Sequence, residues 1–329
     1  MLNAAIVGLG LWGRQMVDAV LEDGRPKSAQ FRFTRAVTRT PDKAADFADR
    51  HGLPVTDDIA SVLDDPEIQA VVLATPHNQH LGQIEAAAAA GKHVFVEKPL
   101  TLDALSATKA VAACESADVV LAVGHNRRFL PALTALKDIV VAGELGTVMH
   151  VEGNFSGNAA YAFRPGMWRA DRAQNPAGGM AAMGIHMVDA LIYLCGSISS
   201  VQAQSLRQVL EISVDDTTSM LFRFESGITG YLGTITATPP HWRIQIFGSK
   251  GWANMRDPQT IDVRRQDGEI ETHTFPSIDI ELAELEAFAE AVAGGAPYPV
   301  TSEQAVHGIA VFEAVTRSVD RQGKQVDVM

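Results

Sequence analysis

Short apolar runs alternate with helical stretches over roughly the first 123 residues. The runs that predict strands are 4–7, 31–38, a short piece near residue 55, 70–74, 93–96 and 119–123. Helices are expected to begin at Pro41 and Asp42, in the regions of Asp57 and Asn78, and at Thr101, because Asn, Asp and Thr are good N-caps. This rhythm predicts a parallel sheet wound with helices.

Beyond Gly146 the pattern changes to longer strands in which apolar and polar positions alternate. In residues 219–225, Met220, Phe222 and Phe224 face one way and the residues between them face the other. Further strands are expected at 148–155, 201–208, 228–235, 243–247 and 261–265, with a hairpin turn at Asp267 and Gly268. A connecting helix is expected at 129–142, another at about 180–194, and two more close the chain. The pattern indicates an open, mainly antiparallel sheet with one more apolar face.

A glycine run follows the first strand directly. Its residues are Gly8, Leu9, Gly10, Leu11, Trp12 and Gly13. A tight glycine turn and the helix start behind it hold a pyrophosphate through backbone amides, so a dinucleotide is expected at this edge of the sheet. The predicted fold class is therefore α/β: a Rossmann dinucleotide-binding domain over residues 1–125 and an α+β domain over 126–329.

The end of the second strand favours NADP over NAD. A carboxylate usually receives the ribose hydroxyls of NAD there, but this chain has Thr38, Arg39 and Thr40, with no acid until Asp42. A guanidinium and two hydroxyls suit a 2′-phosphate. The alternative interpretation is that Arg39 is a solvated loop charge, which leaves NAD open.

The loop after the fourth strand, with Thr75, Pro76, Asn78 and His80, is also expected at the cofactor edge. His77 and His80 resemble a metal pair, but neither Cys nor a close carboxylate accompanies them, so no metal is predicted.

Lys98 follows the strand 93–96 at its carboxyl end. A lysine beside the nicotinamide can stabilise the alkoxide that forms as hydride leaves. The alternative is a strand-end lysine that reaches into solvent. Pro99 restricts the backbone of Lys98, and the bond between them could be cis. His186 is the second catalytic candidate, since an imidazole suits a base that accepts an alcohol proton. A histidine on an apolar helix face can equally be a satisfied core residue.

Charge and cysteine content limit the binding partners and the cellular compartment that can be expected for this chain. The formal charge of −12 argues against nucleic acid and anionic membranes. Cys114 and Cys195 are far apart in apolar runs, which predicts no disulfide and fits a reducing cytoplasm. No export signal is visible, and no apolar stretch reaches the roughly 18 residues of a membrane span.

Four segments together resemble the Gfo/Idh/MocA family of oxidoreductases, and the likeness runs nearly end to end. They are Gly8 to Gly13, Gly91 through Glu97, Lys98 and Pro99, residues 125–129, and residues 184–189. The resemblance implies a nicotinamide cofactor, a sugar or cyclitol hydroxyl as substrate, and a C-terminal sheet that commonly serves oligomerisation. It implies that Lys98 is the active-site lysine and His186 the catalytic histidine, that Glu97 and Asn126 contact the cofactor, and that Arg127 contacts the substrate.

The chain departs from the family in one position. Many members carry an aspartate four residues before the histidine, on the same helix face, and here that residue is Ala182. If His186 is not the base, Asp189 or a residue of the loop around 161–169 is the expected alternative. That loop, with Tyr161, Trp168 and Arg169, is interpreted as a substrate lid, or else as a surface loop packed by its own aromatic residues.

The sequence thus predicts an NADP-preferring dehydrogenase, or reductase in the reverse direction, for a secondary hydroxyl of a sugar, sugar acid or cyclitol. One alternative is a same-fold enzyme that oxidises its substrate only transiently, during glycoside cleavage or epimerisation. Another is a non-catalytic sugar or cofactor sensor, which Ala182 keeps open. A homodimer or homotetramer is expected to cover the partly apolar outer face of the second sheet, around Leu221 and Tyr231.

Overall fold

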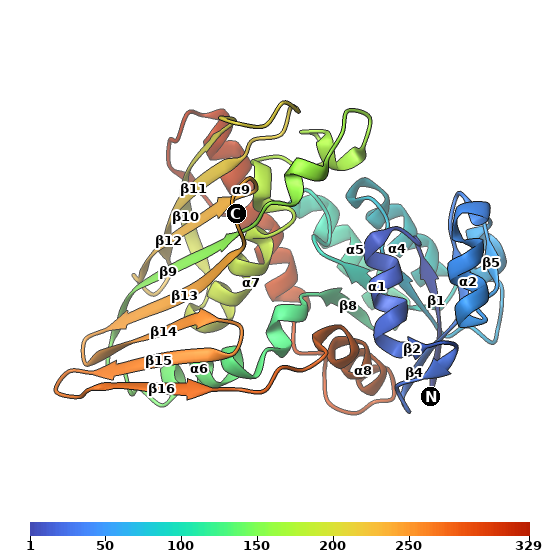
Figure 1. Cartoon of the computed structure of the whole chain (residues 1–329), viewed down its shortest axis with the longest axis horizontal. Coiled ribbons are helices and arrows are strands. Elements are labelled where there is room, and N and C mark those ends of the chain that lie inside the picture. Colours follow the sequence, from blue (N-terminus) through green and yellow to red (C-terminus); the bar gives the residue numbers. More distant parts are fainter. The chain divides into compact units, whose positions relative to one another are not determined.

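The computed structural model of the chain describes residues 1–329 (Figure 1). Two compact units are present. The first comprises Met1–Thr101, Leu105–Asn126 and Asp279–Ala305, and the second comprises Leu102–Ala104, Arg127–Ile278 and Val306–Met329. No helix is both long enough and apolar enough to cross a bilayer.

The first unit is built on a six-stranded parallel sheet in the order β5-β4-β1-β6-β7-β8. Its strands are β1 (Leu2–Val7), β4 (Phe31–Val37), β5 (Val55–Thr56), β6 (Ala70–Leu73), β7 (His93–Glu97) and β8 (Leu121–Gly124). Its helices are α1 (Leu11–Val20), α2 (Ala45–His51), α3 (Ile59–Leu63), α4 (His80–Ala89), α5 (Ala104–Ser116) and α8 (Ile280–Val292), and β2 (Leu21–Glu22) pairs with β3 (Arg25–Pro26). All of β6 is buried, which explains its unbroken apolar sequence, since parallel sheets are covered on both faces. The predicted Rossmann architecture is confirmed.

The second unit carries a nine-stranded sheet in the order β16-β15-β14-β13-β9-β12-β11-β10-β17. Its strands are β9 (Val148–Ser156), β10 (Ile198–Leu206), β11 (Thr217–Phe224), β12 (Thr229–Ile235), β13 (His241–Gly248), β14 (Gly251–Asp257), β15 (Thr260–Arg265), β16 (Ile270–Thr274) and β17 (Val326–Asp327). Only β9 and β12 pair in parallel. The helices α6 (Pro131–Val141), α7 (Gly184–Cys195) and α9 (Ser302–Asp320) lie on one side of this sheet (Figure 1). Met220, Phe222 and Phe224 point into that covered side, as the alternation predicts.

Two of the sequence predictions in the second unit need correction. The helix expected from residue 180 begins at Gly184, because Ala177 and Gly178 both adopt left-handed backbone angles and start a tight 3₁₀ turn at Gly178–Met180. Strand β14 was not predicted, since Trp252, Asn254 and Arg256 do not form a clear alternating run with their neighbours.

The segment Asp279–Ala305 returns to the first unit, although the sequence rhythm assigns everything after residue 125 to the second. The ring of Phe288 packs edge-on against Phe95, with centroids 5.8 Å apart. Tyr298 donates its hydroxyl to the carbonyl of Val123 at 3.1 Å, and Ser28 donates to Glu286 at 2.7 Å. The core of the nucleotide-binding unit is therefore completed by residues from late in the chain.

Candidate active site

The glycine loop between β1 and α1 has the geometry of a phosphate cradle. Gly8 has a φ of +103°, and a Cβ on it would lie 2.5 Å from the carbonyl oxygen of Ala74. A Cβ on Gly13 would lie 1.8 Å from the carbonyl oxygen of Gly8, so only glycine allows helix α1 to approach the strand this closely. Above Gly10 the space is open. No side chain caps the start of α1 and no acid stands in its first turn, which leaves its amides able to bind an anion.

The segment after β4 contains Thr38, Arg39 and Thr40, the residues expected to contact the adenosine ribose of the cofactor; we call it the ribose corner. Thr38 is half-buried and bonded through its amide to Thr56, whereas Arg39 and Thr40 are exposed. The sequence interpretation missed Arg14, which comes directly after the last glycine of the loop. Its guanidinium donates to the carbonyls of Leu9 at 3.2 Å and Lys43 at 2.8 Å, and so ties the glycine loop to this corner.

The loop Thr75–His80 leaves β6 at the same edge of the sheet, and Thr75, Pro76 and Asn78 are at least partly exposed. His80 is different, because its side chain is fully buried. Its Nδ1 lies 3.0 Å from the carbonyl oxygen of Pro99 and its Nε2 lies 3.1 Å from that of Thr75. Burial lowers the pKa of His80, against the opposing effect of these carbonyls. The ring therefore joins the Thr75 loop to the turn after Lys98, and the contact of His80 with the cofactor stays a prediction.

Lys98 follows β7, and the Lys98–Pro99 bond is cis. The preceding Glu97 is buried, and desolvation raises its pKa to about 7. The positive charge of Lys98 and the indole of Trp12 oppose that rise, while the carboxylate of Glu281 adds to it.

Asn126, at the end of the first unit, is buried and donates its Nδ2 to Oε1 of Glu281 at 3.0 Å. Gln15 donates to the same oxygen at 3.2 Å. The returning helix α8 thus supplies a carboxylate to the group formed by Trp12, Glu97 and Asn126. The open space over Gly10, the uncapped α1 and this polar group at the end of the sheet fit a dinucleotide cofactor.

In the second unit, His186 lies in the first turn of α7 and is buried. Its ring centroid is 6.2 Å from that of Phe155, which in turn meets Trp242 edge-on at 4.9 Å. The guanidinium of Arg127 stands over both aromatic rings, at 5.6 and 5.7 Å. The structure therefore brings the predicted residues His186 and Arg127 to one aromatic wall. Phe155 and Trp242 were missed, because only the pairing of β9 with β13 places them side by side.

Asp189 forms an ion pair and is not available as the alternative base. Arg128 donates from Nε and Nη2 to its two carboxylate oxygens, at 2.8 and 2.9 Å, and both side chains are buried. The guanidinium of Arg128 also lies 4.4 Å from the ring centroid of Tyr193. This pair fixes helix α7, and with it His186, against the segment after Asn126.

Ala182 is exposed in the turn that precedes α7. The expectation that it shares a helix face with His186 is therefore wrong, because the helix begins two residues later.

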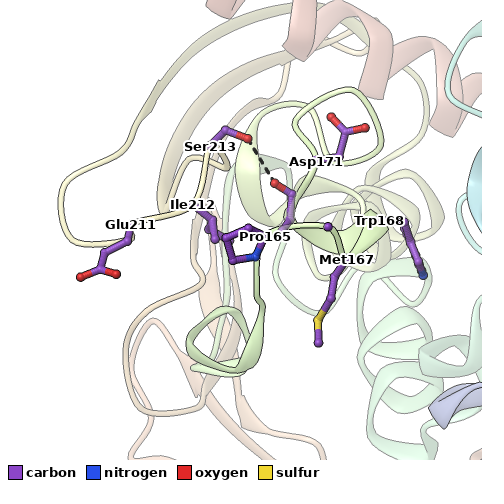
Figure 2. Close-up of a pocket in the computed structure, with 9 residues that line it drawn as sticks. Pro165, Met167, Trp168, Asp171, Glu211, Ile212 and Ser213 are labelled. Carbon is purple, nitrogen blue, oxygen red and sulfur yellow. Dashed lines mark hydrogen bonds between the residues drawn. The ribbon is translucent and has the colours of Figure 1, made fainter.

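The lid loop forms a surface hollow of about 490 Å³ with residues 211–213 (Figure 2). Ser213 donates to the carbonyl of Ala170 at 3.1 Å across it. The Arg169 guanidinium stacks 4.2 Å from the Trp168 ring, and burial lowers the pKa of Arg169. Tyr161 is exposed and donates to the carbonyl of Ala237. Trp168 lines this hollow, whereas Arg127 and His186 do not.

No cluster of three or more His, Cys, Asp or Glu side chains has the arrangement of a metal site.

Comparison with known proteins agrees with this architecture. Residues 2–125 match the family described as "Oxidoreductase family, NAD-binding Rossmann fold", and residues 133–254 match the "GFO/IDH/MocA C-terminal domain". A D-xylose 1-dehydrogenase (NADP(+)) from Haloferax volcanii is 30% identical over 305 residues, which cover 89% of this chain and 91% of the relative. The rhizopine catabolism protein MocA from Rhizobium meliloti is 28% identical over 325 residues, or 96% of this chain and 94% of the relative.

Solved structures show the same fold. An oxidoreductase from Thermotoga maritima superposes with a TM-score of 0.87 at 26% identity and covers 99% of this chain and 98% of its own. Levoglucosan dehydrogenase in complex with NADH and levoglucosan gives a TM-score of 0.88 at 22% identity, with 99% of both chains covered. With both halves matched and the glycine loop, Lys98 and His186 in place, the chain belongs to the Gfo/Idh/MocA family of NAD-binding oxidoreductases.

Proposed function

We propose that this protein is an NADP-preferring dehydrogenase, or reductase in the reverse direction, for a secondary hydroxyl of a sugar, sugar acid or cyclitol. The observation that carries the cofactor preference is the ribose corner, where exposed Arg39 and Thr40 stand in place of a carboxylate. Similarity to a D-xylose 1-dehydrogenase (NADP(+)) and to a levoglucosan dehydrogenase supports the substrate class.

Lys98 and His186 carry the chemistry of the proposed reaction. A bound nicotinamide supplies or accepts the hydride. The ammonium group of Lys98 polarises the substrate oxygen and stabilises the charge that develops on it. His186 takes the hydroxyl proton in the oxidative direction and returns it in the reductive one. Asp189 holds α7 through its ion pair with Arg128.

The substrate is held by residues of the second unit in this proposal. Arg127, over the Phe155 and Trp242 rings, suits hydroxyl or carboxylate oxygens beside an apolar sugar face. Tyr161, Trp168 and Arg169 of the lid complete the substrate contacts. The two free thiols, Cys114 and Cys195, fit a reducing cytoplasm, and burial raises the pKa of both.

A screen of sugars, sugar acids and cyclitols with NADP and NAD, followed by the absorbance of the reduced nicotinamide, tests the proposal. We expect turnover of at least one such substrate, faster with NADP at limiting cofactor. Cofactor retained through purification with product but no net reduced nicotinamide would instead identify an enzyme that oxidises its substrate transiently. Cofactor binding without any turnover across the panel would identify a sensor and overturn the proposal.

A further inference from the structure

We propose that the Glu97 carboxyl exchanges a proton with solvent near neutral pH and thereby makes the protein's preference for oxidised over reduced cofactor depend on pH. The ionised carboxylate favours the cationic oxidised nicotinamide, and the protonated carboxyl favours the neutral reduced ring. The inference rests on the cofactor of the proposed function and not on its substrate.

The protein holds the Glu97 side chain in a space made for it. Glu97 is the last residue of β7, only 6% exposed, and pairs with Gly124 at the end of β8. A Cβ on Gly124 would lie 2.8 Å from Oε1 of Glu97, so glycine lets the carboxyl occupy its present position without a shift. No donor lies at ordinary hydrogen-bond distance from Oε1 of Glu97, and the Trp12 indole and the Lys98 backbone amide favour the ionised form less strongly than the Lys98 charge does. A buried carboxylate oxygen without a donor is costly, so this position favours the protonated form unless a positive charge comes near.

Desolvation is the largest influence on this carboxyl, and two neighbouring charges act on it in opposite directions, Lys98 more strongly than Glu281. Lys98 follows on the same strand end, and Glu281 approaches from α8, held there by Gln15 and Asn126. The α1 side contributes only the Trp12 indole, and the β8 side contributes Gly124. The pKa of Glu97 is raised to about 7, so both protonation states are populated near neutrality and one added charge decides between them.

The sheet order places Glu97 on the nicotinamide side. In a doubly wound sheet the dinucleotide lies across the point where the strand order reverses, here between β1 and β6. The residues expected to contact the adenosine ribose follow β4, which lies on the same side of the reversal point as β1. The nicotinamide half of the cofactor is therefore expected to extend the other way, toward β6 and β7. A positive charge on that ring would favour the ionised carboxylate, and at the effective dielectric of a protein site such an interaction would change the ionisation equilibrium by about tenfold.

The test measures the dissociation constants of NADP⁺ and NADPH by calorimetry and fluorescence between about pH 6 and pH 8, on either side of the pKa of 7. The quantity of interest is the ratio of the two constants, because titration of the 2′-phosphate is common to both ligands. In the native protein we expect binding of the oxidised form to improve about five- to tenfold relative to the reduced form as the pH rises. Glu97→Gln should make the ratio independent of pH.

Two further variants sharpen the test. Glu281→Gln removes the neighbouring negative charge and should move the midpoint of the ratio to lower pH, which keeps the inference testable if Glu97→Gln does not fold. Glu286→Gln, a carboxyl on the same helix that bonds Ser28, is the matched control and should behave as the native protein. A ratio that is flat in the native protein, or equally pH-dependent in Glu97→Gln, would overturn the inference. If no substrate is turned over but the ratio of the two dissociation constants depends on pH as expected, the proposed function is wrong and this inference stands.

Discussion

Arg39 is an exposed cation at the position where NAD-preferring enzymes carry a carboxylate. Replacing it with alanine should weaken NADP binding by about 1.5 to 3 kcal/mol, the scale of a charge-assisted hydrogen bond, and leave NAD nearly unchanged. Titration of both cofactors checks this, with Arg25→Ala, an exposed arginine in β3, as the control. Equal losses for NADP and NAD would show that Arg39 does not read the 2′-phosphate.

Glu97 should also make the stability of the cofactor-free protein depend on pH. Its pKa is raised from 4.5 to about 7, so its folded form holds a proton that the unfolded chain releases over that interval. Stability from this group is therefore full below about pH 4.5 and falls as the pH rises through 7. Glu97→Gln should melt above the native protein at pH 8, with a difference that shrinks toward pH 5. A difference that does not change with pH would mean that Glu97 is ionised throughout.

His186 is the residue on which the proton transfer of the proposed reaction depends. His186→Ala should reduce turnover by about 10² to 10⁴, the range for loss of a positioned acid or base. Oxidative turnover in the native protein should fall in acid, because an imidazole that already carries a proton cannot accept another. That acid limb should be missing from the pH profile of His186→Gln. If the limb persists there, another residue moves the proton, and Asp189 is excluded by its two bonds to Arg128.

At the scale of an element, helix α7 depends on one buried ion pair. Asp189→Ala leaves the Arg128 guanidinium buried without its carboxylate and should cost about 3 to 5 kcal/mol of unfolding free energy in denaturant. Removing both charges with Arg128→Met and Asp189→Leu should recover most of that loss, since replacing a buried pair by apolar residues is often neutral. A double variant as unstable as the single one would mean that the pair itself, and not an isolated charge, holds the helix.

The elements that the sequence predicted best are those whose signal is local. The apolar runs of β1 and β6 and the glycine turn after β1 report burial and backbone shape within a few residues. The start of α7 was predicted too early, because the left-handed pair Ala177 and Gly178 looks unremarkable among small residues. Phe155, Trp242 and Glu281 were not predicted, because their neighbours in space are far away in the sequence. The register of β9 with β13 pairs Phe155 with Trp242, and the return of α8 brings Glu281 to Asn126.

At the scale of the whole molecule, the uncovered face of the nine-stranded sheet should mediate assembly. Leu221 is 53% exposed and pairs across the strands with Tyr231 on that face. We expect a dimer or tetramer by light scattering at micromolar concentration, and Leu221→Glu should shift it toward smaller species. Leu105→Glu, which changes an exposed leucine of α5 in the first unit, is the control and should leave the assembly unchanged. A native monomer would contradict the prediction.

The return of Asp279–Ala305 to the first unit has a consequence for synthesis on the ribosome. A nascent chain that has emerged only as far as β8 lacks Phe288 to pack on Phe95 and Tyr298 to bond Val123. Its nucleotide-binding unit therefore stays incompletely folded, with part of its apolar surface uncovered, while more than 150 further residues of the second unit are translated. Loss of the last fifty residues, far from the glycine loop in sequence, would for the same reason remove part of the cofactor half along with α9.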